Sequence, residues 1–306
     1  MKPIASFNGE IIDADQLQIP VYDTGFMLGV TVSEQLRTFR GRPFHVTQHL
    51  ERLRGGLQLI GLDDRVDINA LGPVIEEIAE HNYGLGQPED DLGVTVFVTP
   101  GPYRTYVPEG TPQPNVAVHT YPLPFQLWHR QYQHGQPLQV VDVQQIRPQS
   151  WPPELKCRSR MHYYLADRRA KEVDPAATAV LLDSDGFVSE TPIANLVIYH
   201  KSRGLLSPPR EKILPGVSLE FLHQLATDLE LPIQFHDLTV KDLESADEIL
   251  LTRTPYCVMP AASINGISLP AGGADTIFAR FLRAWSEDVQ VDIAKQAETI
   301  ARERVR

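Results

Sequence analysis

The chain contains the run Trp151-Pro152-Pro153-Glu154-Leu155-Lys156 and, further along, the run Val188-Ser189-Glu190-Thr191-Pro192-Ile193-Ala194-Asn195-Leu196. A helical pattern begins just after Lys156, and a strand-like pattern begins at Leu196. Between them the pattern changes from helix to strand to turn. A lysine, a carboxylate and an amide that recur in this order are the first candidates for a functional site.

Size and composition restrict what the protein can be. A chain of 306 residues is too long for one average core, so two domains are expected. The net charge of -11 argues against nucleic acid as a partner. No apolar run is long enough to span a membrane, and the N-terminus lacks a signal-peptide core, so no membrane association is expected. Only two cysteines are present, which favours a reducing, cytoplasmic location.

Residues 1–121 are predicted to form a small N-terminal domain. Asn8-Gly9 and Gly41 are typical of tight turns between short strands. Thr47 is expected to cap a helix in which leucine and isoleucine recur every three or four residues until Gly61. The other expected elements are a helix at 68–81 and strands at 92–99 and 115–120.

Periodicity fails in the proline- and glutamine-rich stretch that follows, so residues 122–137 are predicted to connect two domains. Residues 138–306 are predicted to form the larger domain. Its expected elements are strands at 138–143, 178–182, 196–199 and 246–252, and helices at 159–172 and from Leu214 to Leu229. The stretch 275–304 is expected to form one long amphipathic helix.

The candidate residues match the needs of pyridoxal phosphate (PLP). This cofactor requires a lysine amine, a partner for its ring nitrogen and an anchor for its phosphate. Lys156 offers the amine, and Glu190 offers a carboxylate that favours a protonated ring. Asn195 either orders the site or is a simple turn residue.

The phosphate has several candidate partners. Arg52 borders the apolar face of the first helix, where it either turns its guanidinium inward or extends to solvent. The run Leu214-Pro215-Gly216-Val217-Ser218 begins a helix, and a helix start is a ready anion site. Thr252 and Thr254 end a strand and offer hydroxyls. The histidine and cysteine spacing does not indicate a metal site.

In their order and spacing, these motifs resemble the class IV, or fold type IV, PLP-dependent aminotransferases. The resemblance covers nearly the whole chain. It is carried by Asp23-x-Gly25-Phe26-x2-Gly29, Glu34-x2-Arg37, His49-x2-Arg52-Leu53, Lys156, Glu190-x4-Asn195, Leu214-x-Gly216-Val217-Ser218 and Thr252-x-Thr254. It implies an α/β (α+β) fold with a small N-terminal α/β domain and a larger C-terminal domain built on a mixed sheet.

The resemblance also implies roles for individual residues. Lys156 would be the catalytic residue that binds the cofactor and moves the proton. The other implied cofactor-binding residues are Arg52, Glu190, Asn195, Val217, Ser218 and Thr254. Family members form homodimers whose active site lies near the subunit interface, and their substrates are small amino acids and keto acids.

The chain departs from the family pattern around the expected substrate pocket. Leu28 stands where an aromatic residue is common, and Arg104 is the candidate to replace an arginine missing from the loop that begins at Thr99. Met161 occupies the position of a tyrosine that contacts the cofactor hydroxyl in branched-chain enzymes. Tyr163 and Tyr164 lie nearby.

Three functions remain open from the sequence. The first is a PLP-dependent aminotransferase that moves an amino group between an amino acid, or an amine, and a 2-keto acid by a ping-pong Schiff-base mechanism. The second is a PLP lyase similar to aminodeoxychorismate lyase, which the Ala194-Asn195-Leu196 ending favours. The third is a non-catalytic protein that has kept the fold.

Overall fold

The computed structural model describes residues 1–107 and 109–304. The chain divides into two compact units. The first comprises Met1–Leu123 and the short run Glu154–Ser159, and the second comprises Pro124–Pro153 and the residues from Arg160 onward. Each unit has its own sheet with helices packed against it, so the expected α/β class is confirmed.

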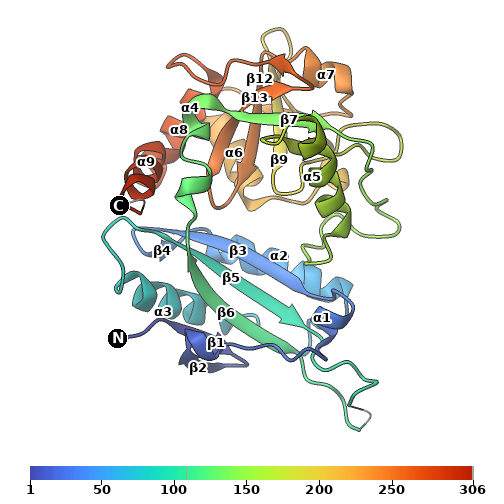
Figure 1. Cartoon of the computed structure of the whole chain (residues 1–306), viewed down its shortest axis with the longest axis vertical. Helices are drawn as coiled ribbons and strands as arrows, with labels where there is room; N and C mark the ends of the chain where they lie inside the picture. Colours follow the sequence, from blue (N-terminus) through green and yellow to red (C-terminus); the bar gives the residue numbers. More distant parts are fainter. Residues whose placement is uncertain (108, 305–306) are drawn as a thin grey trace. The chain divides into compact units, whose positions relative to one another are not determined.

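The sheet of the first unit has the strand order β2-β1-β6-β5-β3-β4, and all neighbouring strands are antiparallel (Figure 1). Two hairpins follow the turn signals in the sequence, because Asn8-Gly9 and Arg40-Gly41 both take the positive φ angles of a two-residue turn. The strands are β1 (Ile4–Phe7), β2 (Glu10–Asp13), β3 (Val32–Phe39), β4 (Arg42–Pro43), β5 (Leu92–Thr99) and β6 (Asn115–Pro122).

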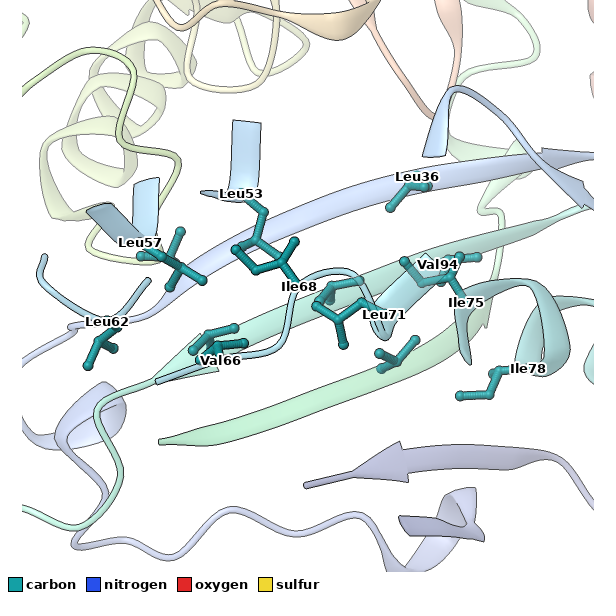
Figure 2. Close-up of a cluster of buried hydrophobic side chains, with 14 of the residues drawn as sticks. Leu36, Leu53, Leu57, Leu62, Val66, Ile68, Leu71, Ile75, Ile78 and Val94 are labelled. Atoms are coloured by element: carbon teal, nitrogen blue, oxygen red, sulfur yellow. The ribbon is translucent and has the colours of Figure 1, made fainter. Parts of the chain in front are cut away.

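Two helices bury their apolar faces in the core of this unit. Figure 2 shows leucines 53 and 57 of one helix and isoleucines 75 and 78 of the other lying among the side chains of the sheet. Because these residues recur at helical spacing, each helix packs through a single face. The helices of this unit are η1 (Ala14–Gln16), α1 (Thr24–Met27), α2 (Val46–Leu59) and α3 (Leu71–Tyr83).

The beginnings of both long helices differ from the sequence expectation. Thr47 was expected to cap α2, but it lies inside the first turn, and His45 precedes the helix with a left-handed φ of 53°. Since β4 ends at Pro43, the chain has only two residues in which to turn into the helix. The helix expected from Ile68 begins at Leu71, because the Asp67 carboxylate instead accepts backbone hydrogen bonds in the preceding turn.

The sheet of the second unit is mixed. Its strand order is β11-β10-β9-β12-β13-β7-β8, with β14 paired to β13. The pairs β10/β11, β13/β7 and β7/β8 are parallel and the others are antiparallel. The strands are β7 (Gln136–Val140), β8 (Thr178–Val180), β9 (Asn195–His200), β10 (Gly204–Ser207), β11 (Ile233–Phe235), β12 (Glu248–Arg253), β13 (Cys257–Ile264) and β14 (Ile267–Ser268).

Helices pack on this sheet and on one another. α6 packs against β12, α8 against β13, and Phe221 of α6 meets Trp285 of α8 edge-on with ring centroids 4.9 Å apart. α5 packs against β7 and β8 through its alanines. The helices are η2 (Phe125–Leu127), α4 (Gln131–His134), α5 (Met161–Val173), η3 (Arg210–Lys212), α6 (Val217–Asp228), α7 (Val240–Glu244), α8 (Ile277–Asp288) and α9 (Ile293–Glu303).

The expectation of one long C-terminal helix is wrong. The chain leaves α8 after Asp288, and Gln290 takes a positive φ of 55°. Asp292 then caps α9, because its carboxylate accepts a hydrogen bond from the Lys295 backbone N–H at 3.0 Å. Because Asp292 caps the start of a new helix, α8 and α9 are two separate helices.

The described part of the chain, residues 1–107 and 109–304, has no helix that is both long and apolar enough to span a bilayer.

Candidate active site

Lys156 lies on an extended run that pairs with the first part of β3. The Lys156 carbonyl accepts a hydrogen bond from the Ser33 N–H at 2.9 Å, and the Arg158 N–H donates to the Thr31 carbonyl at 2.9 Å. Cys157 forms an antiparallel bridge with Val32. Backbone pairing on both sides of the lysine therefore fixes the position from which its side chain extends.

Next to this run, a carboxylate in β3 holds two side chains of α2. Glu34 is 1% exposed and accepts hydrogen bonds from Arg52 Nε at 2.8 Å, from Arg52 Nη2 at 2.7 Å and from His49 Nδ1 at 2.7 Å. Burial opposes the charge, but the Arg52 guanidinium and the His49 ring hold the pKa of Glu34 well below its usual range. The structure therefore places Arg52 inward, with its planar head fixed by two bonds to one carboxylate.

His49 shows that the lysine is near this group. Burial lowers the pKa of His49, and the charges of Arg52 and Lys156 lower it further, against the opposing effect of Glu34. Its Nδ1 donates a hydrogen to Glu34, since a carboxylate can only accept. Its buried Nε2 atom has no hydrogen-bond partner within residues 1–107 and 109–304.

The two candidate substrate residues lie on exposed segments of the first unit. Leu28 follows α1 and is 57% exposed, next to Gly29, whose carbonyl accepts a hydrogen bond from Ser159 Oγ at 2.6 Å. Leu28 is therefore linked to the lysine run. Arg104 is exposed in the turn after β5, where the neighbouring Tyr103 N–H donates to the Tyr22 carbonyl at 2.8 Å. A role for Arg104 toward the substrate therefore stays a prediction.

In the second unit, Glu190 is the centre of a polar network. This carboxylate is 5% exposed. Its Oε1 accepts from Tyr163 Oη at 2.8 Å and from Gln145 Nε2 at 3.1 Å, and its Oε2 accepts from Asn195 Nδ2 at 3.0 Å and from the Leu214 N–H at 3.2 Å. Four donors around one buried carboxylate suit its charged form.

Asn195 fastens this carboxylate to the beginning of α6. Besides Glu190, its Nδ2 donates to the Leu214 carbonyl at 2.9 Å. A Cβ atom at Gly216 would lie 2.0 Å from Asn195 Oδ1, so a side chain there would push the amide away. In the structure the amide therefore orders the Glu190 carboxylate and the Leu214 backbone.

The beginning of α6 and the end of β12 together fit a phosphate. Gly216 precedes the helix and offers no side chain to cap it. The backbone N–H groups of Val217 and Ser218 lie in the first turn, where a helix provides no intrahelical acceptor for them, so they can donate to an anion. Ser218 Oγ lies 3.3 Å from Thr254 Oγ1. Thr252 stands opposite Asn195 in the β9/β12 pair, and its buried hydroxyl has no hydrogen-bond partner in the described chain. These donors suit the phosphate of PLP.

The comparison with known protein families bears on the three functions left open by the sequence. Residues 31–264 match the family described as Amino-transferase class IV, which is more than half of the chain. The chain belongs to the class IV aminotransferases. It is therefore a transaminase, and this family uses PLP. The resemblance seen in the motifs is confirmed, and a non-catalytic role is not supported.

Relatives of this class IV aminotransferase include several activities. D-alanine aminotransferase of Staphylococcus epidermidis is 23% identical over 285 residues, which cover 92% of this chain and 96% of that protein. Aminodeoxychorismate lyase of Bacillus subtilis is 24% identical over 279 residues, which cover 85% of this chain and 86% of that protein. The names of the relatives thus leave the substrate open.

Solved structures support the fold type IV architecture. The branched-chain amino acid aminotransferase of Escherichia coli superposes with a TM-score of 0.83 at 19% identity and covers 94% of each chain. A T.th. branched-chain amino acid aminotransferase with pyridoxamine 5'-phosphate has a TM-score of 0.82 at 20% identity, also with 94% coverage of each chain. At such identities the likeness concerns the fold alone.

The sequence predicted no contact with Glu190 for two residues of its cluster, although Tyr163 was noted as lying near Met161. Tyr163 and Gln145 reach Glu190 from 27 and 45 residues away in sequence, and a periodicity argument has no signal for such contacts. Glu34 and His49 did stand in the quoted motifs, but without a role. The strand Val32–Phe39 carries several polar residues, so no sequence pattern marked Glu34 as the anchor of Arg52.

Proposed function

We propose that this class IV aminotransferase binds PLP through Lys156 and moves an amino group between an amino acid, or an amine, and a 2-keto acid in two half-reactions. Overall, the amino group and α-hydrogen of the donor are exchanged for the keto oxygen of the acceptor, so an amino acid donor becomes a keto acid, an amine donor becomes an aldehyde or ketone, and the acceptor becomes a new amino acid. When bound, PLP supplies the electron sink that makes the α-hydrogen acidic.

The protein's own groups divide this work. Lys156 carries the amine that holds the cofactor and moves the proton at the substrate carbon. Glu190, ordered by Asn195, holds the ring nitrogen. Arg52 serves the phosphate, together with the donors at the start of α6, Val217 and Ser218, and the Thr254 hydroxyl. The observation that carries the proposal is the buried Glu190 carboxylate with its four donors, because such a group suits a cationic ring.

Covalent trapping tests this proposal. The purified protein is mixed with PLP, its visible absorption is recorded, and borohydride is added before peptide mapping. We expect a visible band that borohydride removes, with the cofactor mass found on the peptide that contains Lys156. A modified peptide elsewhere, or no band, would refute the assignment.

Replacement of the lysine gives the kinetic test. Lys156→Ala should lower kcat by at least about 10³-fold, because a positioned acid–base group contributes about 10²–10⁴ and the attachment point is lost as well. Lys171→Ala is the matched control, since Lys171 is an exposed lysine of α5. It should keep full activity. If the Lys156 variant transaminates at the normal rate, the proposed role is wrong.

The residues that contact the substrate, the oligomeric state and the cellular location are also proposals. Leu28 and Arg104 are the candidate substrate-side residues, and a screen of L- and D-amino acids with 2-oxoglutarate and pyruvate should show which donor the enzyme uses. We further propose a cytoplasmic homodimer. Sedimentation of the holoenzyme near twice the mass of one 34.3 kDa chain would support the dimer, and a monomer would exclude it.

The relationship to aminodeoxychorismate lyase of Bacillus subtilis favours one alternative outcome. A lyase would release pyruvate from aminodeoxychorismate without any amino acceptor. If pyruvate forms in the absence of a keto acid and no amino group is transferred, the lyase reaction replaces the transaminase reaction.

A further inference from the structure

We propose that Tyr163 is a positioning residue that, together with Gln145, aims the Glu190 carboxylate and weakens it as a base, so that a proton shared with the cofactor remains on the ring nitrogen. This inference rests on the proposed function, because it assigns a task to the residue that holds the ring. It adds two residues to those that the motifs indicate.

The three side chains form a closed triangle of hydrogen bonds. Tyr163 Oη donates to Glu190 Oε1 at 2.8 Å. Gln145 Nε2 carries two hydrogens, and it lies 2.8 Å from Tyr163 Oη and 3.1 Å from Glu190 Oε1. One amide nitrogen therefore serves both oxygens, and the phenol and the amide meet at the same carboxylate oxygen.

Gln145 determines where the phenol hydrogen points. Its Oε1 accepts a hydrogen bond from the Ile146 N–H at 3.1 Å, which fixes the amide with its nitrogen toward Tyr163. Its backbone N–H donates to the Leu182 carbonyl at 2.8 Å, which holds the residue in place. Because the amide fills a lone pair of the phenol oxygen, the phenol hydrogen is directed to Glu190.

The phenol is held firmly and stays protonated. The Tyr163 ring packs beside the alanine-rich cluster of α5 and β8, and the Arg160 guanidinium lies 4.6 Å from the ring centroid. Burial, followed by the negative charge of Glu190, raises the pKa of Tyr163 well above its usual value. Tyr163 is therefore a neutral donor throughout the range in which enzymes of this kind work.

The neighbouring tyrosine, Tyr164, is not buried in this way. Tyr164 is 67% exposed, and Met161, at the position of the tyrosine in branched-chain enzymes, is 70% exposed. Of the two tyrosines that the sequence left open, Tyr163 is thus the one that reaches the site. It does so at the Glu190 carboxylate.

The donors matter because Glu190 and the ring nitrogen compete for one proton. Each hydrogen bond to the charged carboxylate stabilises that charge and lowers its proton affinity. Without the phenol hydrogen, the carboxylate becomes a stronger base and draws the proton away from the ring. A neutral ring is a weaker electron sink, so the chemical step should slow while substrate binding changes little.

The test follows the ring nitrogen directly. Holoenzyme is prepared with PLP carrying ¹⁵N in the ring, and the nitrogen chemical shift is measured by NMR for the wild type and for Tyr163→Phe, Gln145→Met and Tyr164→Phe. We expect the pyridinium position in the wild type and in Tyr164→Phe. We expect a shift toward neutral pyridine in Tyr163→Phe, and a smaller shift in the same direction in Gln145→Met.

Kinetics give the second readout. Tyr163→Phe should lower kcat about tenfold and change KM less than about twofold, as expected for the loss of one hydrogen bond to a charged group. The double variant Tyr163→Phe/Gln145→Met should lose less than the product of the two single losses, because both act through one carboxylate oxygen. Tyr164→Phe should keep normal kinetics.

The outcomes separate the two proposals. If the wild type binds no PLP, the proposed function and this inference both fail. If the wild type shows a pyridinium signal and Tyr163→Phe keeps it, only this inference is overturned, and Tyr163 has a structural role. If Tyr163→Phe does not fold, Gln145→Met decides, since an unchanged nitrogen shift in that variant would also overturn the inference.

Discussion

The replacement Glu34→Gln tests how the first cluster is held together. Glu34 lies in the first half of β3, is 1% exposed and accepts three hydrogen bonds from Arg52 and His49. Glutamine has nearly the same shape but one oxygen fewer and no charge. The change therefore leaves packing in place and removes a charged partner of the Arg52 side chain, which is only 9% exposed.

The magnitude follows from the geometry. In its best orientation, glutamine keeps its oxygen where Oε2 accepts from Arg52 Nη2 and His49 Nδ1. Its NH₂ group must then face Arg52 Nε, which loses its acceptor. One lost bond to a charged group costs about 1.5–3 kcal/mol, and breaking a buried ion pair costs about 3–5 kcal/mol. We expect a loss of about 3 kcal/mol in the free energy of unfolding.

The effect should depend on pH. The pKa of Glu34 in the folded protein lies below the ordinary value of 4.5. The charged Glu34 side chain therefore contributes its full stabilisation when the pH is above about 4.5. It declines as the pH falls further, because the unfolded carboxylate takes up a proton first. The difference in unfolding free energy between the wild type and Glu34→Gln should therefore narrow as the pH falls from about 5 to about 3.5.

Urea denaturation of the two proteins without cofactor measures both effects. Glu51→Gln is the matched control, because Glu51 is the exposed neighbour of Arg52 in α2, and its replacement should change stability by less than about 0.5 kcal/mol. Equal unfolding free energies for the wild type and Glu34→Gln at neutral pH would refute the reasoning. So would a difference that stays constant down to a pH of about 3.5.

Two further predictions concern the fold. Leu53→Ala removes a fully buried side chain from the core of the first unit and should lower the free energy of unfolding by about 2–5 kcal/mol. Leu59→Ala, at a position 45% exposed in the same helix, should lower it by less than about 1 kcal/mol. Equal losses in urea denaturation would contradict the packing described. Asp292→Ala removes the cap of α9 and should lower the free energy of unfolding, measured by thermal denaturation, by about 1 kcal/mol, while Asp292→Asn should keep most of that stability. An alanine variant as stable as the wild type would show that the cap does not stabilise the helix.

Local patterns predicted local structure well. Asn8-Gly9 indicated a hairpin because few other residue pairs accept two positive φ angles, and the structure has that turn. The β-branched run of β5 was likewise predicted, and the helix expected from Leu214 is present but begins at Val217, after Gly216. The break between α8 and α9 was also present in the sequence, since Asp292 is a capping residue, but the amphipathic pattern continued across it and concealed the break.

Such local patterns did not predict the tertiary contacts. β13 was not among the predicted strands, and it contains Pro260, a residue type that is unfavourable in a central strand. In the structure, β13 pairs with β12 through Pro260, and its pairing with β7 starts only at Ala261. For the site, spacing indicated Glu190 and Lys156 but not the partners that hold them, because those contacts depend on how strands and helices pack.

The run Glu154–Ser159 has a consequence for how the protein can be divided. It is far along the chain, yet its backbone completes pairing at the first part of β3. A fragment ending at Leu123 would therefore lack a piece of its own sheet and would not be a self-sufficient folding module. A synthetic peptide spanning that run would supply the same fragment with its missing backbone partner in trans. During synthesis, the first unit therefore cannot complete its backbone pairing until residue 159 has been made.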